Sequence, residues 1–118
     1  HAQREQNAAM EQDDREGLVK EYLEKLLPEN WDKLDVFDRK HYLQDYGKPG
    51  QPEAVRKRET VSNLEIWCEC FGKPKEDIKP SDSYAIAAIM VRIEGWRKTD
   101  GREIQPIYRR QRLYKRES

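Results

Sequence analysis

Residues 62–72 read SNLEIWCECFG and describe one helix with a defined beginning and end. Ser62 is a good N-cap, and Glu65 three residues later completes the capping-box pattern. Gly72, followed by Lys73-Pro74, is a good stop signal. The sequence therefore predicts a helix from Asn63 to Phe71. Apolar residues at helical spacing define its buried face, which consists of Leu64, Trp67, Cys68 and Phe71.

A second helix is predicted to begin near Ser81 or Asp82. Its core-facing residues recur at positions 0, 3, 4 and 7, as a helix with one buried face requires. These residues are Ile86, Ile89, Met90 and Ile93. The opposite face would then present Tyr84, Ala85, Ala88 and Arg92. Small alanines allow close approach to a DNA groove, but this face lacks the hydrogen-bonding groups of a strict sequence reader.

Beyond Gly95 the helical period ends and a basic hairpin is predicted. Asp100-Gly101 is a dipeptide that favours a tight turn between two strands. The first arm is Trp96–Thr99, and the second runs from Glu103 to about Lys115. Pro106 makes a fully regular second arm unfavourable. Strand alternation along this arm predicts that Tyr108 and Tyr114 face one side and Leu113 the other.

The chain upstream is predicted to be mainly helical. Apolar spacing favours a helix from Asp13 or Asp14 to Leu27, ended by Pro28. Asp35 is a good N-cap for a second, short helix. A Gly- and Pro-rich loop covers 47–58, and 59–61 is expected to be a very short strand. We expect the apolar-poor residues 1–13 to be a linker from an upstream region.

This order of elements is typical of one winged-helix-like domain over residues 14–118. A helix–loop–helix pair is followed by a hairpin, so the fold class is α+β, mostly helical, with a C-terminal β-hairpin. In such domains the second helix of the pair lies on DNA, and the hairpin reaches the flanking phosphates.

The charge distribution favours an anionic partner for the C-terminal part. The 118 residues have no net charge, with 23 basic and 23 acidic side chains. Residues 92–118 contain nine basic and four acidic residues, a balance of +5, so residues 1–91 carry −5. A basic segment on a mildly acidic domain is a typical nucleic-acid footprint, although a solvated tail explains the same charges.

We expect this basic segment to contact phosphates of duplex DNA with weak sequence preference. Arg97, Lys98 and Arg102 flank the predicted turn and are the first candidates. Arg110 and Arg112 follow on the second arm. The full set of predicted DNA-binding residues is Arg92, Arg97, Lys98, Arg102, Arg110 and Arg112.

No metal or cofactor site is predicted. Cys68 and Cys70 form a CxC pair, but residues two apart on a helix point about 200° from each other. Zinc prefers four ligands, and His41 is the sole internal histidine. Structural, reduced cysteines are therefore favoured over ligands and over a Cys–His nucleophile. Two cysteines also favour a reducing cytoplasm, and no apolar run is long enough for a membrane span.

Catalysis is not expected either. Glu65 and Glu69 are four residues apart, so they could form a pair of catalytic acids. A capping role for Glu65 and a solvent-exposed position for Glu69 account for them more simply.

Several phrases of the sequence resemble the C-terminal end of the virulence-associated protein E family. They are LPENW at 27–31, LEIWCECFG at 64–72, KPSDSY at 79–84, GW at 95–96 and YRRQRLY at 108–114. The resemblance runs from about Gln12 to Arg116. Members of this family resemble replication helicases of phages, prophages and genomic islands, with a P-loop ATPase core upstream.

The resemblance implies a C-terminal accessory DNA-binding domain of a mobile-element replication helicase. The chain has no GxxxxGK[ST] motif, so the family's ATPase is expected upstream, and His1 suggests an excised piece. The upstream helicase core would be a partner of this domain. An alternative is a protein-interaction or assembly module of the same helicase without DNA binding of its own, and a free-standing enzyme is the third choice.

Overall fold

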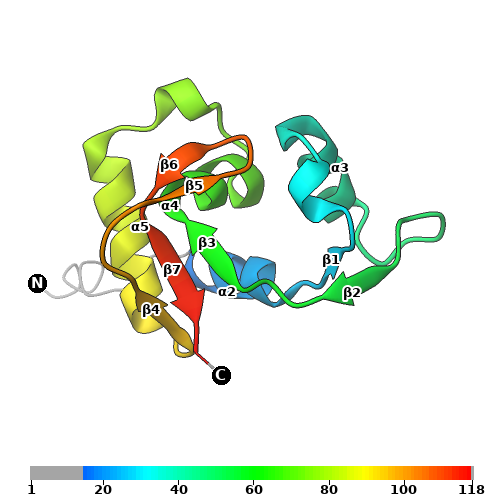
Figure 1. Ribbon diagram of the computed structural model, residues 1–118, viewed down its shortest axis with the longest axis horizontal. Coiled ribbons are helices and arrows are strands. Elements are labelled where there is room, and N and C mark those ends of the chain that lie inside the picture. Colours follow the sequence, from blue (N-terminus) through cyan, green and yellow to red (C-terminus); the bar gives the residue numbers. More distant parts are fainter. Residues whose placement is uncertain (1–14, 118) are drawn as a thin grey trace, which may run out of the picture.

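The computed structural model describes residues 15–117, so the expected linker 1–13 lies outside the described part (Figure 1). The helices are α2 (Glu16–Glu24), α3 (Val36–Gln44), α4 (Asn63–Glu65) and α5 (Pro80–Arg92). The strands are β1 (Leu27–Pro28), β2 (Ala54–Arg56), β3 (Thr60–Ser62), β4 (Trp96–Lys98), β5 (Glu103–Gln105), β6 (Arg109–Gln111) and β7 (Leu113–Arg116).

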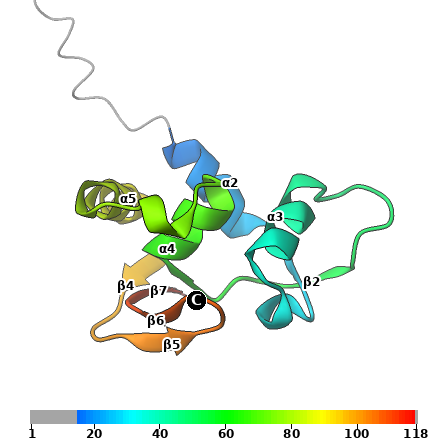
Figure 2. The same cartoon turned by 90° about the horizontal axis from the view of Figure 1, so that it is seen from above.

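A three-stranded antiparallel sheet, ordered β3-β7-β4, is the centre of the fold. Tyr114 of β7 lies opposite both Val61 of β3 and Lys98 of β4. Figure 2 shows α2, α4 and α5 on one side of this sheet, whereas α3 extends to one side with the β1–β2 pair. The chain therefore has the expected α+β architecture.

The helix that follows β3 forms as the capping box predicts. Ser62 Oγ accepts from the backbone N–H of Glu65, and the Glu65 carboxylate accepts from the backbone N–H of Ser62. α4 then continues as one π-helical segment, Ile66–Cys70, in which the Phe71 N–H donates to the Ile66 carbonyl. Gly72, with φ +70°, ends the helix.

The apolar core contains the residues that the helical spacing predicts. Ile86, Ile89, Met90 and Ile93 of the α5 region are all buried. Trp31, Trp67 and Trp96 are also buried, whereas Phe71 is half-buried.

The first helix is shorter than predicted, because α2 ends at Glu24 and not at Leu27. Leu27 and Pro28 are extended and pair with β2. The extended backbone places Leu27 in a second small cluster with Trp31 and Tyr42, apart from the main core. Burial in this cluster therefore overrides the continuous helical pattern.

The two predicted arms do pair, since β4 lies antiparallel to β7, but the tight turn predicted at Asp100-Gly101 is wrong. The residues between these strands leave the sheet and form the separate β5–β6 hairpin. The predicted alternation also fails, because Tyr108, Leu113 and Tyr114 are all buried. The reason is a long-range contact: Tyr108, at the turn between β5 and β6, is buried and donates its hydroxyl to the Glu69 carboxylate, 39 residues away in the sequence.

Glu69 is buried, which corrects the solvent-exposed position expected for it. Its carboxylate accepts hydrogen bonds from three side chains: Tyr22 Oη at 2.7 Å, Arg39 Nη1 at 2.8 Å and Tyr108 Oη at 2.8 Å. These donors belong to α2, α3 and the β5–β6 turn. Burial raises the pKa of both tyrosines, so they remain hydroxyl donors at neutral pH.

A second buried guanidinium, that of Arg58, lies against the same carboxylates. Its nitrogens are 3.8 Å from Glu65 and 3.9 Å from Glu69. The guanidinium also stacks 4.3 Å from the centroid of the Tyr22 ring. We call this group the Glu69 cluster, and it consists of Tyr22, Arg39, Arg58, Glu65, Glu69 and Tyr108.

We expect Glu69→Gln to destabilise the protein strongly. The change leaves Arg39 and Arg58 buried without their main counter-charge, and breaking a buried ion pair costs about 3–5 kcal/mol. Urea unfolding measures the loss of free energy. Glu94→Gln, at an exposed position, is the matched control. Equal unfolding midpoints for the two variants would contradict a central role for Glu69.

Glu65 makes the stability depend on pH. Burial, reinforced by the Glu69 carboxylate and opposed by Arg58 and Arg39, raises the pKa of Glu65 from 4.5 to about 7. The folded protein therefore binds this proton more tightly than the unfolded chain does. The stabilising contribution is complete below the unfolded pKa and is lost as the pH rises through about 7.

Glu65→Gln tests this dependence, because glutamine is uncharged and still suits the capping box. Between about pH 5 and pH 8 we expect the variant to gain stability relative to the wild type. Urea unfolding at both pH values provides the comparison. A stability difference that is the same at both values would show that Glu65 does not titrate in this range.

Candidate nucleic-acid interface

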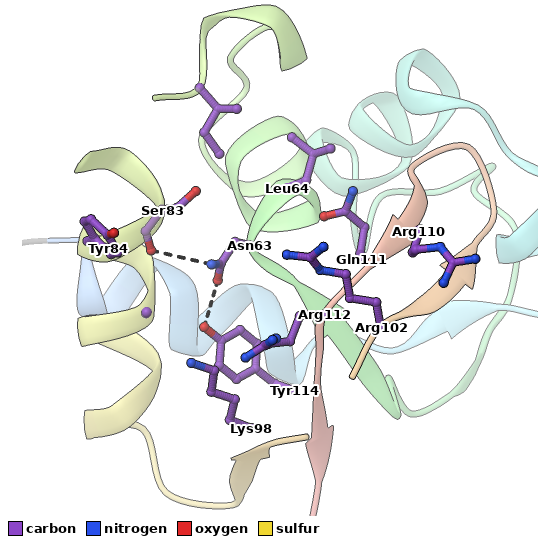
Figure 3. A pocket seen from close by; sticks show the side chains of 12 residues that line it. Asn63, Leu64, Ser83, Tyr84, Lys98, Arg102, Arg110, Gln111, Arg112 and Tyr114 are labelled. Atoms are coloured by element: carbon purple, nitrogen blue, oxygen red, sulfur yellow. Dashed lines mark hydrogen bonds between the residues drawn. The ribbon is translucent and has the colours of Figure 1, made fainter. Parts of the chain in front are cut away.

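A pocket of about 530 Å³ opens between the first half of α5 and the strand region that follows it (Figure 3). We call it the basic pocket. The residues that line it are Asn63, Leu64, Ile78, Ser83, Tyr84, Ala87, Lys98, Arg102, Arg110, Gln111, Arg112 and Tyr114. They come from α4, α5, β4, β6, β7 and the intervening segments.

Four cations line this pocket, and no carboxylate does. They are Lys98, Arg102, Arg110 and Arg112. None of them forms an ion pair with a carboxylate of residues 15–117. Figure 3 shows Arg102 and Arg112 directed towards Asn63 and Tyr114, whereas Arg110 turns towards the outer edge. An unpaired set of like charges in a concave site concentrates a positive field on an incoming anion.

The floor of the basic pocket is held by hydrogen bonds between separate elements. Tyr114 Oη donates to Asn63 Oδ1 at 2.9 Å, and Asn63 Nδ2 donates to the Ser83 carbonyl at 3.5 Å. Burial raises the pKa of Tyr114, so it remains a donor at neutral pH. β7, α4 and α5 are thereby fixed relative to one another beneath the cations.

Two of the six predicted DNA-binding residues lie outside this pocket. Arg97 is exposed on β4 between Trp96 and Lys98, so strand alternation directs it to the opposite face of the sheet. Arg92 lies at the end of α5, where its guanidinium is 3.7 Å from the Glu16 carboxylate of α2. The structure thus brings together Lys98, Arg102, Arg110 and Arg112.

Sequence reasoning missed the polar and aromatic residues that complete the pocket. No local pattern assigns a role to Asn63 or Gln111, and the helical spacing places Tyr84 only on the outer face of its helix. The position of Asn63 just after the N-cap does not indicate that it lines a pocket, because this role depends on its contact with Tyr114, 51 residues away.

The cysteines do not form a shared site. Cys68 is buried and Cys70 is half-buried, and neither is in a disulfide. Within residues 15–117, no group of three or more His, Cys, Asp and Glu side chains is arranged to hold a metal ion. His41 is exposed and packs its ring 4.3 Å from that of Phe37.

Both thiols should react slowly in the folded protein. Burial raises the pKa of Cys68 to about 11 and that of Cys70 to about 12. Since the thiolate is the reactive form, we expect iodoacetamide at about pH 8 to alkylate the folded protein at least about tenfold more slowly than the urea-unfolded chain. Mass spectrometry follows both rates. Equal rates would show that burial does not protect the thiols.

No protein-family model matches the chain, and no curated protein matches it. The resemblance to the virulence-associated protein E family therefore stays a prediction. Among residues 15–117, no helix combines the length and the apolar character that a membrane crossing needs.

Proposed function

We propose that this chain is a winged-helix-like DNA-binding domain that contacts duplex DNA mainly through backbone phosphates. In its wider setting it would be the C-terminal accessory module of a cytoplasmic, mobile-element replication helicase. The upstream helicase core would then be its partner in the same protein.

The order of elements supports the winged-helix part of this proposal. α4 with its π-helical continuation and α5 form a helix–turn–helix-like pair, and β4 and β7 follow as paired antiparallel strands. β3, which precedes the pair, completes the sheet on the other edge of β7. The β5–β6 hairpin projects from the connection between β4 and β7, where a wing would lie.

The observation that carries the DNA-binding proposal is the basic pocket beside α5. Its cations come from the segment between the end of β4 and the start of β7. They lie next to Ser83 and Tyr84, near the beginning of α5, which is the helix that would lie on DNA. Phosphate contacts of this kind fix a protein on DNA without reading its sequence. The exposed residues of α5 include Tyr84, Ala88 and Val91, which offer no bidentate base contact, so weak sequence preference follows.

The salt dependence of binding tests this proposal. The triple variant Lys98→Ala, Arg102→Ala and Arg112→Ala removes three pocket cations. Each phosphate contact contributes about 0.9 to the slope of log affinity against log salt, so the slope should flatten by up to about 2.7. Fluorescence anisotropy with duplexes of two unrelated sequences measures this, and both should weaken alike.

A matched triple variant controls for net charge. Lys20→Ala, Lys33→Ala and Lys48→Ala remove the same charge from exposed positions outside the basic pocket. These changes should leave most of the slope intact. If both triple variants flatten the slope equally, binding is diffuse and the pocket is not the interface.

A second candidate function, the assembly module, has its own supporting observation. Tyr84, Ala88 and Val91 form an exposed stripe on α5 at positions i, i+4 and i+7, and the outer two are 76% and 84% exposed. Such a stripe fits a protein partner as well as a groove. If the wild type binds no DNA at low salt, while Val91→Lys prevents assembly of the helicase-containing protein, this alternative takes its place.

A further inference from the structure

We infer that the basic pocket receives an unpaired nucleotide of DNA. Its phosphate would lie among Lys98, Arg102 and Arg112, and its base would stack on Tyr84 at the rim. This inference rests on the proposed DNA binding and narrows it to a site where a duplex meets a single strand.

The shape of the site favours an unstacked nucleotide over a base pair. A volume of about 530 Å³ is within the range of roughly 300–1,000 Å³ typical of small-molecule sites. A double helix is far too wide to enter such a pocket, so its backbone phosphates would meet these cations only where their side chains reach the rim. An unpaired nucleotide can leave the stack and reach groups inside a pocket.

The chemistry of the lining fits the two parts of a nucleotide. Guanidinium groups recognise phosphate, and here they face no competing carboxylate within the pocket. Two tyrosines supply aromatic rings: Tyr114 is buried and donates its hydroxyl to Asn63, whereas Tyr84 is 76% exposed. Tyr84 is therefore the ring with a free face, and stacking on an exposed aromatic is how single strands are held.

A comparison of two labelled ligands tests the inference. One is a blunt duplex, and the other is the same duplex with an overhang of about five unpaired thymidines, within the usual site size for a single strand. We expect anisotropy titrations of the wild type to show at least about fivefold tighter binding of the overhang ligand, as expected for one added base–aromatic stack.

Three variants locate the effect. Tyr84→Ala should remove the overhang preference, measured as the ratio of the affinities for the two ligands, whereas Tyr84→Phe, which keeps the ring, should retain that ratio. Phe37→Ala is the control, because it removes an exposed aromatic ring from α3, outside the pocket. The exposure of Tyr84 also means that its replacement should not unfold the protein, which a melting curve verifies.

The outcomes separate this inference from the proposed function. Equal binding of both ligands by the wild type, or a Tyr84→Ala variant that keeps the preference, would overturn the inference while duplex binding still stands. Failure to bind either ligand would remove the proposed function as well. Displacement of the overhang ligand by micromolar free dAMP would show a mononucleotide site and overturn the inference.

Discussion

The buried carboxylate of Glu69 is the interaction on which the rest of the structure depends. Three donors converge on it from α2, α3 and the β5–β6 turn, segments that lie 30 to 47 residues away in the sequence. A carboxylate without these donors would be very unfavourable in an apolar interior. α3, which extends to one side of the fold, and the β5–β6 hairpin, which contributes to the basic pocket, are therefore both attached to the helical core through one charged group.

The local parts of the fold could be predicted because they depend on neighbouring residues. The capping box of Ser62 and Glu65 and the buried face of α5 are set within a few residues, and the structure confirms both. The burial of Glu69 could not be predicted, because its partners Arg39 and Tyr108 are distant in sequence. A glutamate on a helix resembles a solvated residue until those partners are known.

In the candidate site, too, only the features that depend on local sequence could be predicted. Its cations could be predicted from the charge of the last 27 residues, and four of the six named ones line one pocket. The pocket that holds these cations is lined by α5 and the strand region and is completed by Asn63 of α4. No local pattern in the sequence shows that α4 lies there. The predicted turn at Asp100-Gly101 failed for a related reason, since burial of Tyr108 moves the reversal to Pro106–Tyr108.

The residues on both sides of Tyr108 have an uncommon backbone conformation. Ile107 and Arg109 have φ of +60° and +66°, values that are unfavourable for side chains with a Cβ and especially for β-branched isoleucine. The hairpin sequence alone would not choose this shape, so the insertion of Tyr108 must stabilise it. The β5–β6 hairpin and the Glu69 cluster should consequently open and close as one cooperative unit, with amide hydrogens of both exchanging at a common rate.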